Sequence, residues 1–230
     1  MYFKLSNTAT KEILEKFTKA TFKYPNLYTP QQVINGLNEV SIPIITMQEK
    51  DSISLSIWGL LPTKYSEDWG VFQRICNTLN LHENTLDSDL WCTKPIKQQR
   101  GLLPVTGFFT SFIKNGKSFP YHISLKNEKP FYLASVYNTL EDGFITCSLL
   151  IGKSAGFIKQ YQNTVDNVPI IIGEEDVDSW LAHETPFDQV KNILKRRPVI
   201  DFKATPIAKE LFNNDISYDS MLAAYEYPEI

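Results

Sequence analysis

The chain has 230 residues, 43% hydrophobic and 13% aromatic, so it can bury a sizeable core within one domain, expected to span residues 1–230. Its formal net charge is −3, from 23 basic and 26 acidic residues, which excludes a general attraction to phosphate. Any nucleic-acid site must therefore be a local patch. The longest apolar run, residues 168–172, is too short for a membrane span, and the N-terminus lacks a signal-peptide pattern. We expect a cytoplasmic protein with no membrane partner.

The cysteines and histidines do not have the spacing of a metal site. Cys76, Cys92 and Cys147 are odd in number and far apart, and the three histidines are equally scattered. We interpret the thiols as buried or half-buried packing groups, because free Cys behaves as a small hydrophobe. A catalytic Cys–His pair stays open at this level. No metal and no cofactor is expected.

The first half of the chain predicts two helices and two strands. Residues 10–21 form a helical stripe with Thr10 as its cap. Strands are predicted over 44–47, entered through Pro43, and over 52–58, where apolar residues alternate. A helix is expected to open at Ser66, with an apolar face made of Trp69, Phe72, Ile75, Cys76 and Leu79.

From residue 100 to residue 151 the apolar period changes to two. This predicts strands over 102–109, 119–125, 130–137 and 144–151, with turns at Asn115-Gly116 and Asp142-Gly143. Short helices follow at about 154–162, 174–181 and 186–196, the last with Thr185 as cap and Pro186 at its first position. Strands in the middle with helices at both ends predict an α+β fold around a largely antiparallel curved sheet or barrel.

Three short motifs indicate the frame of an active site. The strand ending at Trp58 is stopped by Gly59 and Pro62, since Gly permits close backbone approach and Pro cannot donate a ladder hydrogen bond. The stretches Gly107-Phe108-Phe109 and Val168-Pro169-Ile170-Ile171-Ile172 have the same character. These aromatic and turn residues are mainly expected to determine the fold.

In order, the motifs resemble the SRAP family of SOS-response-associated peptidases, or abasic-site processing proteins, nearly end to end. Residues 58–62 are similar to the family's WGLIP, residues 80–85 to NARxET, residues 104–110 to PxDGFYE and residues 165–172 to HxRMPVIL. The acidic 174–176, Trp180-Leu181 and the closing Tyr227-Pro228-Glu229 also fit.

The resemblance implies an unusual chemistry. Family members expose an N-terminal Cys, whose amine and thiol condense with the aldehyde of an abasic site in single-stranded DNA to form a thiazolidine crosslink. A Glu and a His assist the proton transfers, an Asn positions the sugar, and arginines hold phosphates.

This chain departs from that pattern at its reactive positions. Tyr2 replaces the Cys, Thr110 replaces the Glu, and the His falls on Val165, or on a residue a few positions away if the alignment slips. Tyr2 is also too large for the usual removal of Met1. His82 and Asn167 stand where the family has arginines, which bind phosphate more strongly than a mostly neutral His.

The retained residues give the nucleic-acid-binding candidates, each with a structural alternative. The candidates are Lys4, Trp58, Asn80, His82 and Asn167. Asn80 could cap a turn instead of contacting a sugar, and Lys4 could be a solvated cation. Within the degenerate site, Thr110 could form a local hydrogen bond and Val165 could fill the pocket.

Three hypotheses follow for the function. The first is an SRAP-like protein, impaired in thiazolidine formation, that keeps some binding of single-stranded DNA or nucleotides. The second is amine-only Schiff-base chemistry on abasic DNA through Met1 or Lys4. The third is a non-catalytic interaction module in which the groove serves another ligand, with a protein partner that the sequence does not identify.

Overall fold

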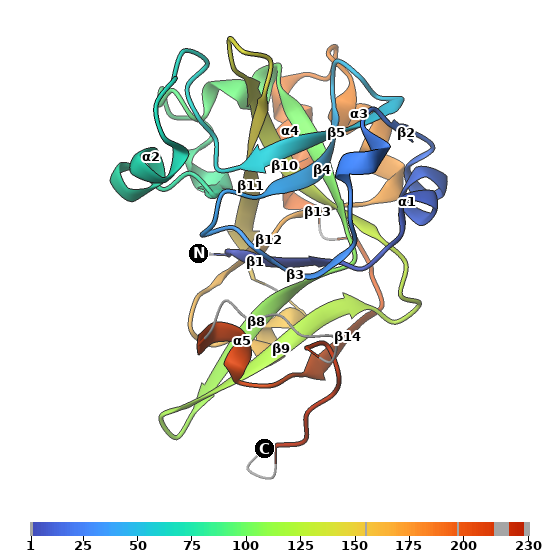
Figure 1. The fold of residues 1–230 in the computed structure, drawn as a ribbon, viewed down its shortest axis with the longest axis vertical. Helices are drawn as coiled ribbons and strands as arrows, with labels where there is room; N and C mark the ends of the chain where they lie inside the picture. Colours follow the sequence, from blue (N-terminus) through green and yellow to red (C-terminus); the bar gives the residue numbers. More distant parts are fainter. Residues whose placement is uncertain (1, 155, 197, 214–220, 228–230) are drawn as a thin grey trace.

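The computed structural model describes residues 2–154, 156–196, 198–213 and 221–227, and it has the expected α+β architecture (Figure 1). The strands are divided between two sheets, and β1 runs between the upper and lower parts of the molecule. The first strand of the chain therefore lies near the middle of the structure (Figure 1).

The larger sheet forms a barrel. Its order is β12-β11-β10-β7-β4-β5-β2, and β5 also pairs in parallel with β11, so five of its strands form a closed ring. Two short strands, β6 and β13, pair with β11 and β10. The bounds are β2 Thr21–Phe22, β4 Ser41–Thr46, β5 Ser52–Trp58, β6 Asn80–His82, β7 Arg100–Val105, β10 Phe131–Thr139, β11 Ile145–Lys153, β12 Asn167–Pro169 and β13 Ile171–Ile172.

The smaller sheet is antiparallel and has the order β14-β9-β8-β1-β3. Its bounds are β1 Lys4–Asn7, β3 Gln31–Asn35, β8 Gly107–Lys114, β9 Lys117–Leu125 and β14 Phe202–Pro206. The predicted turn between β8 and β9 is confirmed, because Asn115 and Gly116 both have positive φ, at 52° and 72°. This is the backbone that a two-residue hairpin turn requires.

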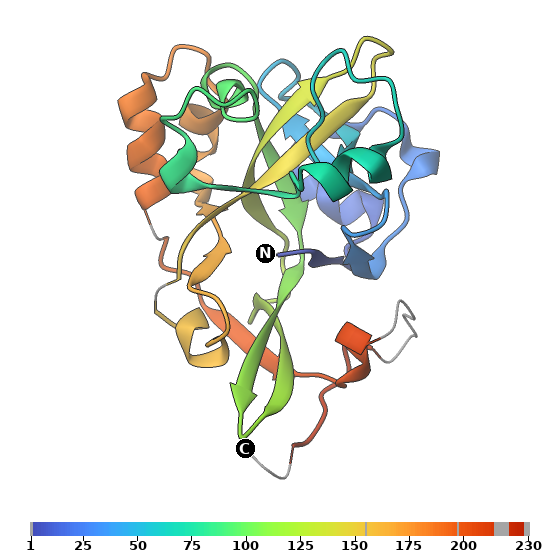
Figure 2. The same ribbon diagram turned by 90° about the vertical axis from the view of Figure 1, so that its left-hand side faces the viewer.

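Helices cover the barrel on two sides. Figure 2 shows α3 and α4 (orange) on the opposite side of the strands from α1 (blue) and α2 (teal). The α-helices are α1 Lys11–Thr18, α2 Trp69–Ile75, α3 Val177–Leu181, α4 Phe187–Lys195 and α5 Glu210–Asn213. The 3-10 helices are η1 Pro25–Leu27, η2 Glu83–Thr85, η3 Lys94–Lys97, η4 Ile158–Tyr161 and η5 Glu174–Asp176.

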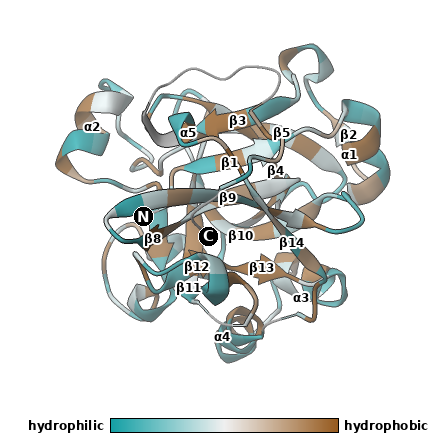
Figure 3. Cartoon of the chain, turned by 90° about the horizontal axis from the view of Figure 1, so that it is seen from below, coloured by the Kyte–Doolittle hydropathy of each residue, from teal (hydrophilic) through white to brown (hydrophobic). Residues whose placement is uncertain are grey.

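Apolar residues gather on the central strands, which appear brown in Figure 3, whereas much of the surrounding loop and helix surface is teal. One buried cluster includes Tyr2, Trp58 and Phe108, and a second lies under the α3 and α4 helices around Trp180. Arg100 is 1% exposed in this region, and its guanidinium donates to the carbonyls of Ile96, Lys97, Trp180 and Ala182.

Several helix boundaries differ from the sequence predictions. The α1 helix begins after Thr10 as predicted, because Thr10 Oγ1 accepts from Ile13 N, but it ends at Thr18 instead of residue 21. The α2 helix is capped by Asp68 rather than Ser66, and its end leaves Ile75 82% exposed and Cys76 exposed. The predicted apolar face was therefore too long.

The C-terminal helices are also corrected. The predicted helix over 154–162 is only the 3-10 turn η4, and the one over 174–181 is η5 followed by α3. Thr185 does not cap α4, because its hydroxyl donates to Ser179 O and Pro186 takes the cap position.

The strand predicted over 102–109 is two strands. It breaks at Thr106, where β7 of the barrel ends and β8 of the smaller sheet begins. Pro43 lies inside β4 instead of before it. The other predicted strands are confirmed with small changes at their ends, while β1, β2, β3, β6, β12, β13 and β14 were not predicted.

Two searches of the described residues gave negative results. No helix there is both long and apolar enough to cross a membrane. Within the same residues, no group of three or more His, Cys, Asp or Glu is placed to hold a metal ion. Of the thiols, Cys92 and Cys147 are buried as expected, whereas Cys76 is exposed.

Candidate functional site

Residue 2 is held by both ends of one amide side chain. Tyr2 N donates to Asn80 Oδ1 at 2.6 Å, and Asn80 Nδ2 donates to Tyr2 O at 2.9 Å. Asn80 opens β6, whose parallel pairing with β11 places it beside Leu149. Both groups of the Asn80 amide thus hold the backbone of residue 2, a contact that neither of the two sequence alternatives, a turn cap or a sugar contact, included.

The side chain of Tyr2 points into the protein and ends at a second amide. Tyr2 is 4% exposed, its ring meets Phe108 edge-on at 5.9 Å between centroids, and its hydroxyl donates to Gln162 Oε1. Gln162 Nε2 in turn donates to Val165 O at 2.7 Å and Asn167 O at 2.8 Å. Gln162 is 5% exposed, so its contact with Tyr2 is buried, while its bonds to the two carbonyls are partly buried.

These contacts keep the phenol of Tyr2 neutral. Burial raises the pKa of Tyr2 well above its usual value, and the hydrogen bond to Gln162 offsets only part of that increase. A protonated phenol that is buried and hydrogen-bonded to the neutral amide of Gln162 is a poor nucleophile at neutral pH. The position that needs an aminothiol for ring closure therefore carries a buried, hydrogen-bonded aromatic ring.

The other two degenerate positions behave differently from each other. Thr110 is 3% exposed, and its hydroxyl donates to Tyr161 O at 3.1 Å, as the alternative interpretation expected. Val165 is 38% exposed and does not fill the pocket; only its carbonyl belongs to the site. The residue that reaches Tyr2 is Gln162, three positions earlier in the chain.

His82 and Asn167 form a pair beside this site. His82 Nδ1 accepts from Asn84 N at 3.1 Å, so the neutral ring carries its proton on Nε2 and donates it to Asn167 Oδ1 at 2.9 Å. Both residues are half-buried. The sequence placed these two residues at the family's arginine positions, and the structure brings them together.

Two of the nucleic-acid candidates are buried. Trp58 is 0% exposed and donates through Nε1 to Leu79 O at 2.9 Å, so it offers no face on which a base could stack. Lys4 is 6% exposed, with its ammonium 6.0 Å from the ring centroid of Phe3, and the expectation of a solvated cation is wrong. In both cases the surrounding strands cover a side chain that the sequence left open.

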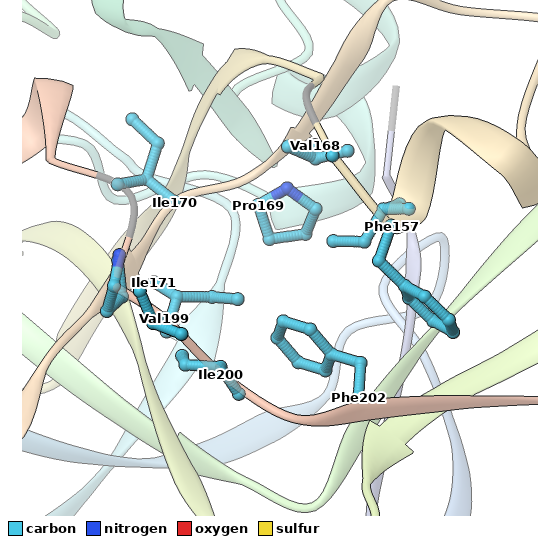
Figure 4. A pocket seen from close by; sticks show the side chains of 11 residues that line it. Phe157, Val168, Pro169, Ile170, Ile171, Val199, Ile200 and Phe202 are labelled. Carbon is cyan, nitrogen blue, oxygen red and sulfur yellow. The ribbon is translucent and has the colours of Figure 1, made fainter.

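An apolar cavity of about 350 Å³ lies next to the segment that carries Gln162. Figure 4 shows side chains around it that include Val168 and Pro169 of β12, Ile171 of β13 and Phe202 at the start of β14. The rings of Phe157 and Phe202 are nearly parallel there, with an interplanar angle of 18° and 6.5 Å between centroids.

A larger cavity, of about 670 Å³ and lined mostly by polar and charged residues, lies beside the His82–Asn167 pair. It adjoins that pair because Glu83 and Asn84 follow His82 and because Lys153 pairs with Asn167 in the β11–β12 ladder. Three ammonium groups line it, from Lys153, Lys191 and Lys195, together with the carboxylates of Glu83 and Asp87. We call it the lysine cavity.

The structure brings residue 2, Asn80, His82, Thr110 and Asn167, all selected from the motifs, to one region. Gln162 lies in the same region and was not selected from the sequence. Gln162 belongs to no motif and follows a short 3-10 helix, so only a shift of the alignment near Val165 could have indicated it. Met1, Pro228 and Glu229 lie outside the described residues.

Comparison with known proteins points to one family. The family model described as SOS response associated peptidase (SRAP) matches residues 2–214. Among curated proteins, none matches the chain.

Solved structures match over almost the whole chain. A protein from Bacteroides thetaiotaomicron is similar with a TM-score of 0.85 and 21% identity, covering 97% of this chain and 100% of that one. A protein from Bordetella bronchiseptica gives 0.72 and 14%, covering 90% and 99%, and a phage-related protein of the same organism gives 0.65 and 17%, covering 90% and 94%. At these identities the similarity shows the fold.

Proposed function

The chain belongs to the SRAP family, and from this premise we propose that it binds single-stranded DNA without forming the family's thiazolidine crosslink. Membership supports a DNA-associated function at the level of the family. The finer assignment concerns what this copy can still do, and it depends on the residues around position 2.

The loss of the crosslink is supported by the contacts of Tyr2. A thiazolidine needs an amine and a thiol on one residue, and Tyr2 supplies a neutral, buried phenol bound to Gln162. Thr110, at the position of the family's Glu, has a hydroxyl that is committed to Tyr161 O. Neither the nucleophile nor the carboxylate that would move its protons is available.

Retained binding is supported by the lysine cavity beside His82 and Asn167. Lys191 is shared between Asp87, at 3.4 Å, and Asp188, at 3.1 Å, so Lys153 and Lys195 are the stronger candidates for phosphate contacts. The apolar cavity with Phe157 and Phe202 offers aromatic surface to an unstacked base (Figure 4). A strand crossing this region would therefore meet cations and aromatic rings.

A salt titration of binding tests this proposal. A labelled single strand should bind at low salt, and three lysine contacts predict a slope of about −2 in log K against log salt, from about −0.7 per phosphate. The Lys153→Ala/Lys195→Ala variant should bind about tenfold more weakly, and its slope should be shallower by about 1.4, since two phosphate contacts are removed. Lys126→Ala is the matched control, because Lys126 pairs with Asp201 and does not line the cavity.

Two results would contradict the proposal on binding. One is an absence of binding at low salt, and the other is an equal loss in the Lys126→Ala control. Either result would favour the hypothesis that the groove serves a different ligand.

The intact mass of the protein, measured before and after incubation with abasic single-stranded DNA, tests the chemistry. We expect no stable adduct and none after borohydride reduction. A reducible adduct would instead support Schiff-base chemistry, and blocking the N-terminal amine would then distinguish Met1 from Lys4.

A further inference from the structure

A second polar cavity, of about 210 Å³, lies on the face of the smaller sheet that points away from Tyr2. Successive residues of a strand face opposite sides of its sheet. Phe108 packs against Tyr2, whereas the next residue, Phe109, packs against His122 at 5.1 Å between ring centroids. The cavity beside His122 is therefore separate from the site described above.

The wall of this cavity is rich in groups that donate hydrogen bonds. Cross-strand pairing sets Lys203 next to Ser124 and Thr205 next to His122. Thr8 and Thr106 continue the wall, and Leu222 closes one side. We call it the His122 cavity.

Two of its buried side chains have unused hydrogen-bonding capacity. Ser124 is 5% exposed, and its hydroxyl has no hydrogen-bond partner among the described residues. His122 is 8% exposed, and its Nε2 is bonded to Ser6 Oγ at 2.7 Å. The structure gives the other ring nitrogen, Nδ1, no partner within the described part of the chain.

A nucleophilic role for the Ser6–His122 pair does not fit the geometry. Ser6 is 0% exposed, so a substrate carbon cannot reach its hydroxyl. Gly107 lies against both side chains, since an added Cβ would come within 2.2 Å of His122 Nε2 and 2.7 Å of Ser6 Oγ. Ser6 therefore fixes the ring of His122 and leaves its other edge for a ligand.

We propose that the His122 cavity binds a small oxyanion of phosphate size, held by Lys203, Ser124 and His122. Lys203 is the one cation among the described lining residues, and its partner Glu128 is a surface carboxylate that is 77% exposed, at 2.7 Å. An exposed ion pair of this kind contributes little, so a better-held anion can replace Glu128. Hydroxyl, imidazole and ammonium donors together are the groups that bind phosphate oxygens.

The ring of His122 provides a direct readout. Burial, and to a lesser extent the charge of Lys203, lowers the pKa of His122 to about 4. Lys203 and Glu128 are the charged groups among the described lining residues. A bound anion favours the imidazolium, so the pKa of His122 should rise by about one unit when the cavity is filled.

The experiment is an NMR titration of His122 at several concentrations of inorganic phosphate, with ribose 5-phosphate and ribose as parallel probes. We expect both phosphates to raise the pKa, with Lys203→Met and Ser124→Ala each weakening the response at least fivefold. Lys126→Met should respond like the unmodified chain, because Lys126 pairs with Asp201. Thermal unfolding of each variant verifies that the fold is intact.

Three outcomes would overturn the inference. These are no response to either inorganic phosphate or ribose 5-phosphate at tens of millimolar, an equal response to ribose alone, or an equal loss in Lys126→Met. A response to ribose 5-phosphate but not to inorganic phosphate would identify a phosphomonoester as the ligand. Binding of single-stranded DNA should be unchanged in Lys203→Met, so this inference and the proposed function can fail independently.

Discussion

Tyr2→Phe tests whether residue 2 is a structural part of the core. The change removes only the phenolic oxygen and leaves Gln162 Oε1 buried without its partner, while Gln162 Nε2 keeps both carbonyls. Leaving a buried acceptor unsatisfied costs about 1–3 kcal/mol. For a chain of this length, a loss of about 2 kcal/mol lowers Tm by about 4–8 °C.

The assay is urea denaturation followed by Trp fluorescence, with Tyr24→Phe as the control. Tyr24 is 61% exposed, so its change should stay within about 0.5 kcal/mol. A double-mutant cycle with Gln162→Leu should give a coupling of about 1 kcal/mol or more, since the two side chains share one hydrogen bond. If Tyr2→Phe matches the control, the reasoning that residue 2 is locked by Gln162 is refuted.

The same contact predicts a pH dependence. The pKa of Tyr2 is raised in the folded state, so the folded chain keeps a proton that the unfolded chain loses above about pH 10. The contribution of Tyr2 to the free energy of unfolding is complete below that pH. It decreases as the pH rises further, by up to about 1.4 kcal/mol per pH unit. Tyr2→Phe should therefore show a shallower loss of stability between about pH 10 and pH 12, and equal slopes would contradict the assignment.

Three further predictions concern the scaffold. Arg100→Met should lower the free energy of unfolding, measured by urea denaturation, by about 3–5 kcal/mol, because it removes a buried guanidinium from four backbone carbonyls. A loss below about 1 kcal/mol would show that water or backbone movement satisfies these carbonyls instead. The pKa of His122 is about 4 in the folded chain, below its usual value of about 6.5. Its contribution to the free energy of unfolding is therefore complete above about pH 6.5 and decreases by about 3 kcal/mol as the pH falls to 4. The His122→Gln variant should lose less stability over that pH range. Gly107→Ala should cost about 3 kcal/mol because the new methyl group meets the backbone as well as Ser6, while Gly70→Ala, whose Cβ would be 3.2 Å from its nearest neighbour, should be close to neutral.

Much of the fold follows from local patterns in the sequence. Alternating residues located the long strands, and Asn115-Gly116 located the hairpin between β8 and β9 because these residues tolerate positive φ. The break at Thr106 was not predicted, since residues 102–109 are mostly apolar and were interpreted as one strand, while the chain passes there from the barrel into the smaller sheet. Short pairings such as β6 depend on distant strands and leave no local signal.

For the candidate site as well, some features follow from the sequence and others only from the tertiary structure. The sequence determined that residue 2 lacks a thiol, that Thr110 lacks a carboxylate and that the frame motifs are in family order, because these depend only on which residues are present. The tertiary structure decided that Tyr2 is turned inward and bound by Gln162, that Asn80 clamps its backbone, and that Lys4 and Trp58 are covered. Burial and partner choice arise from segments far apart in the chain, so they are set by packing and cannot be read from local order.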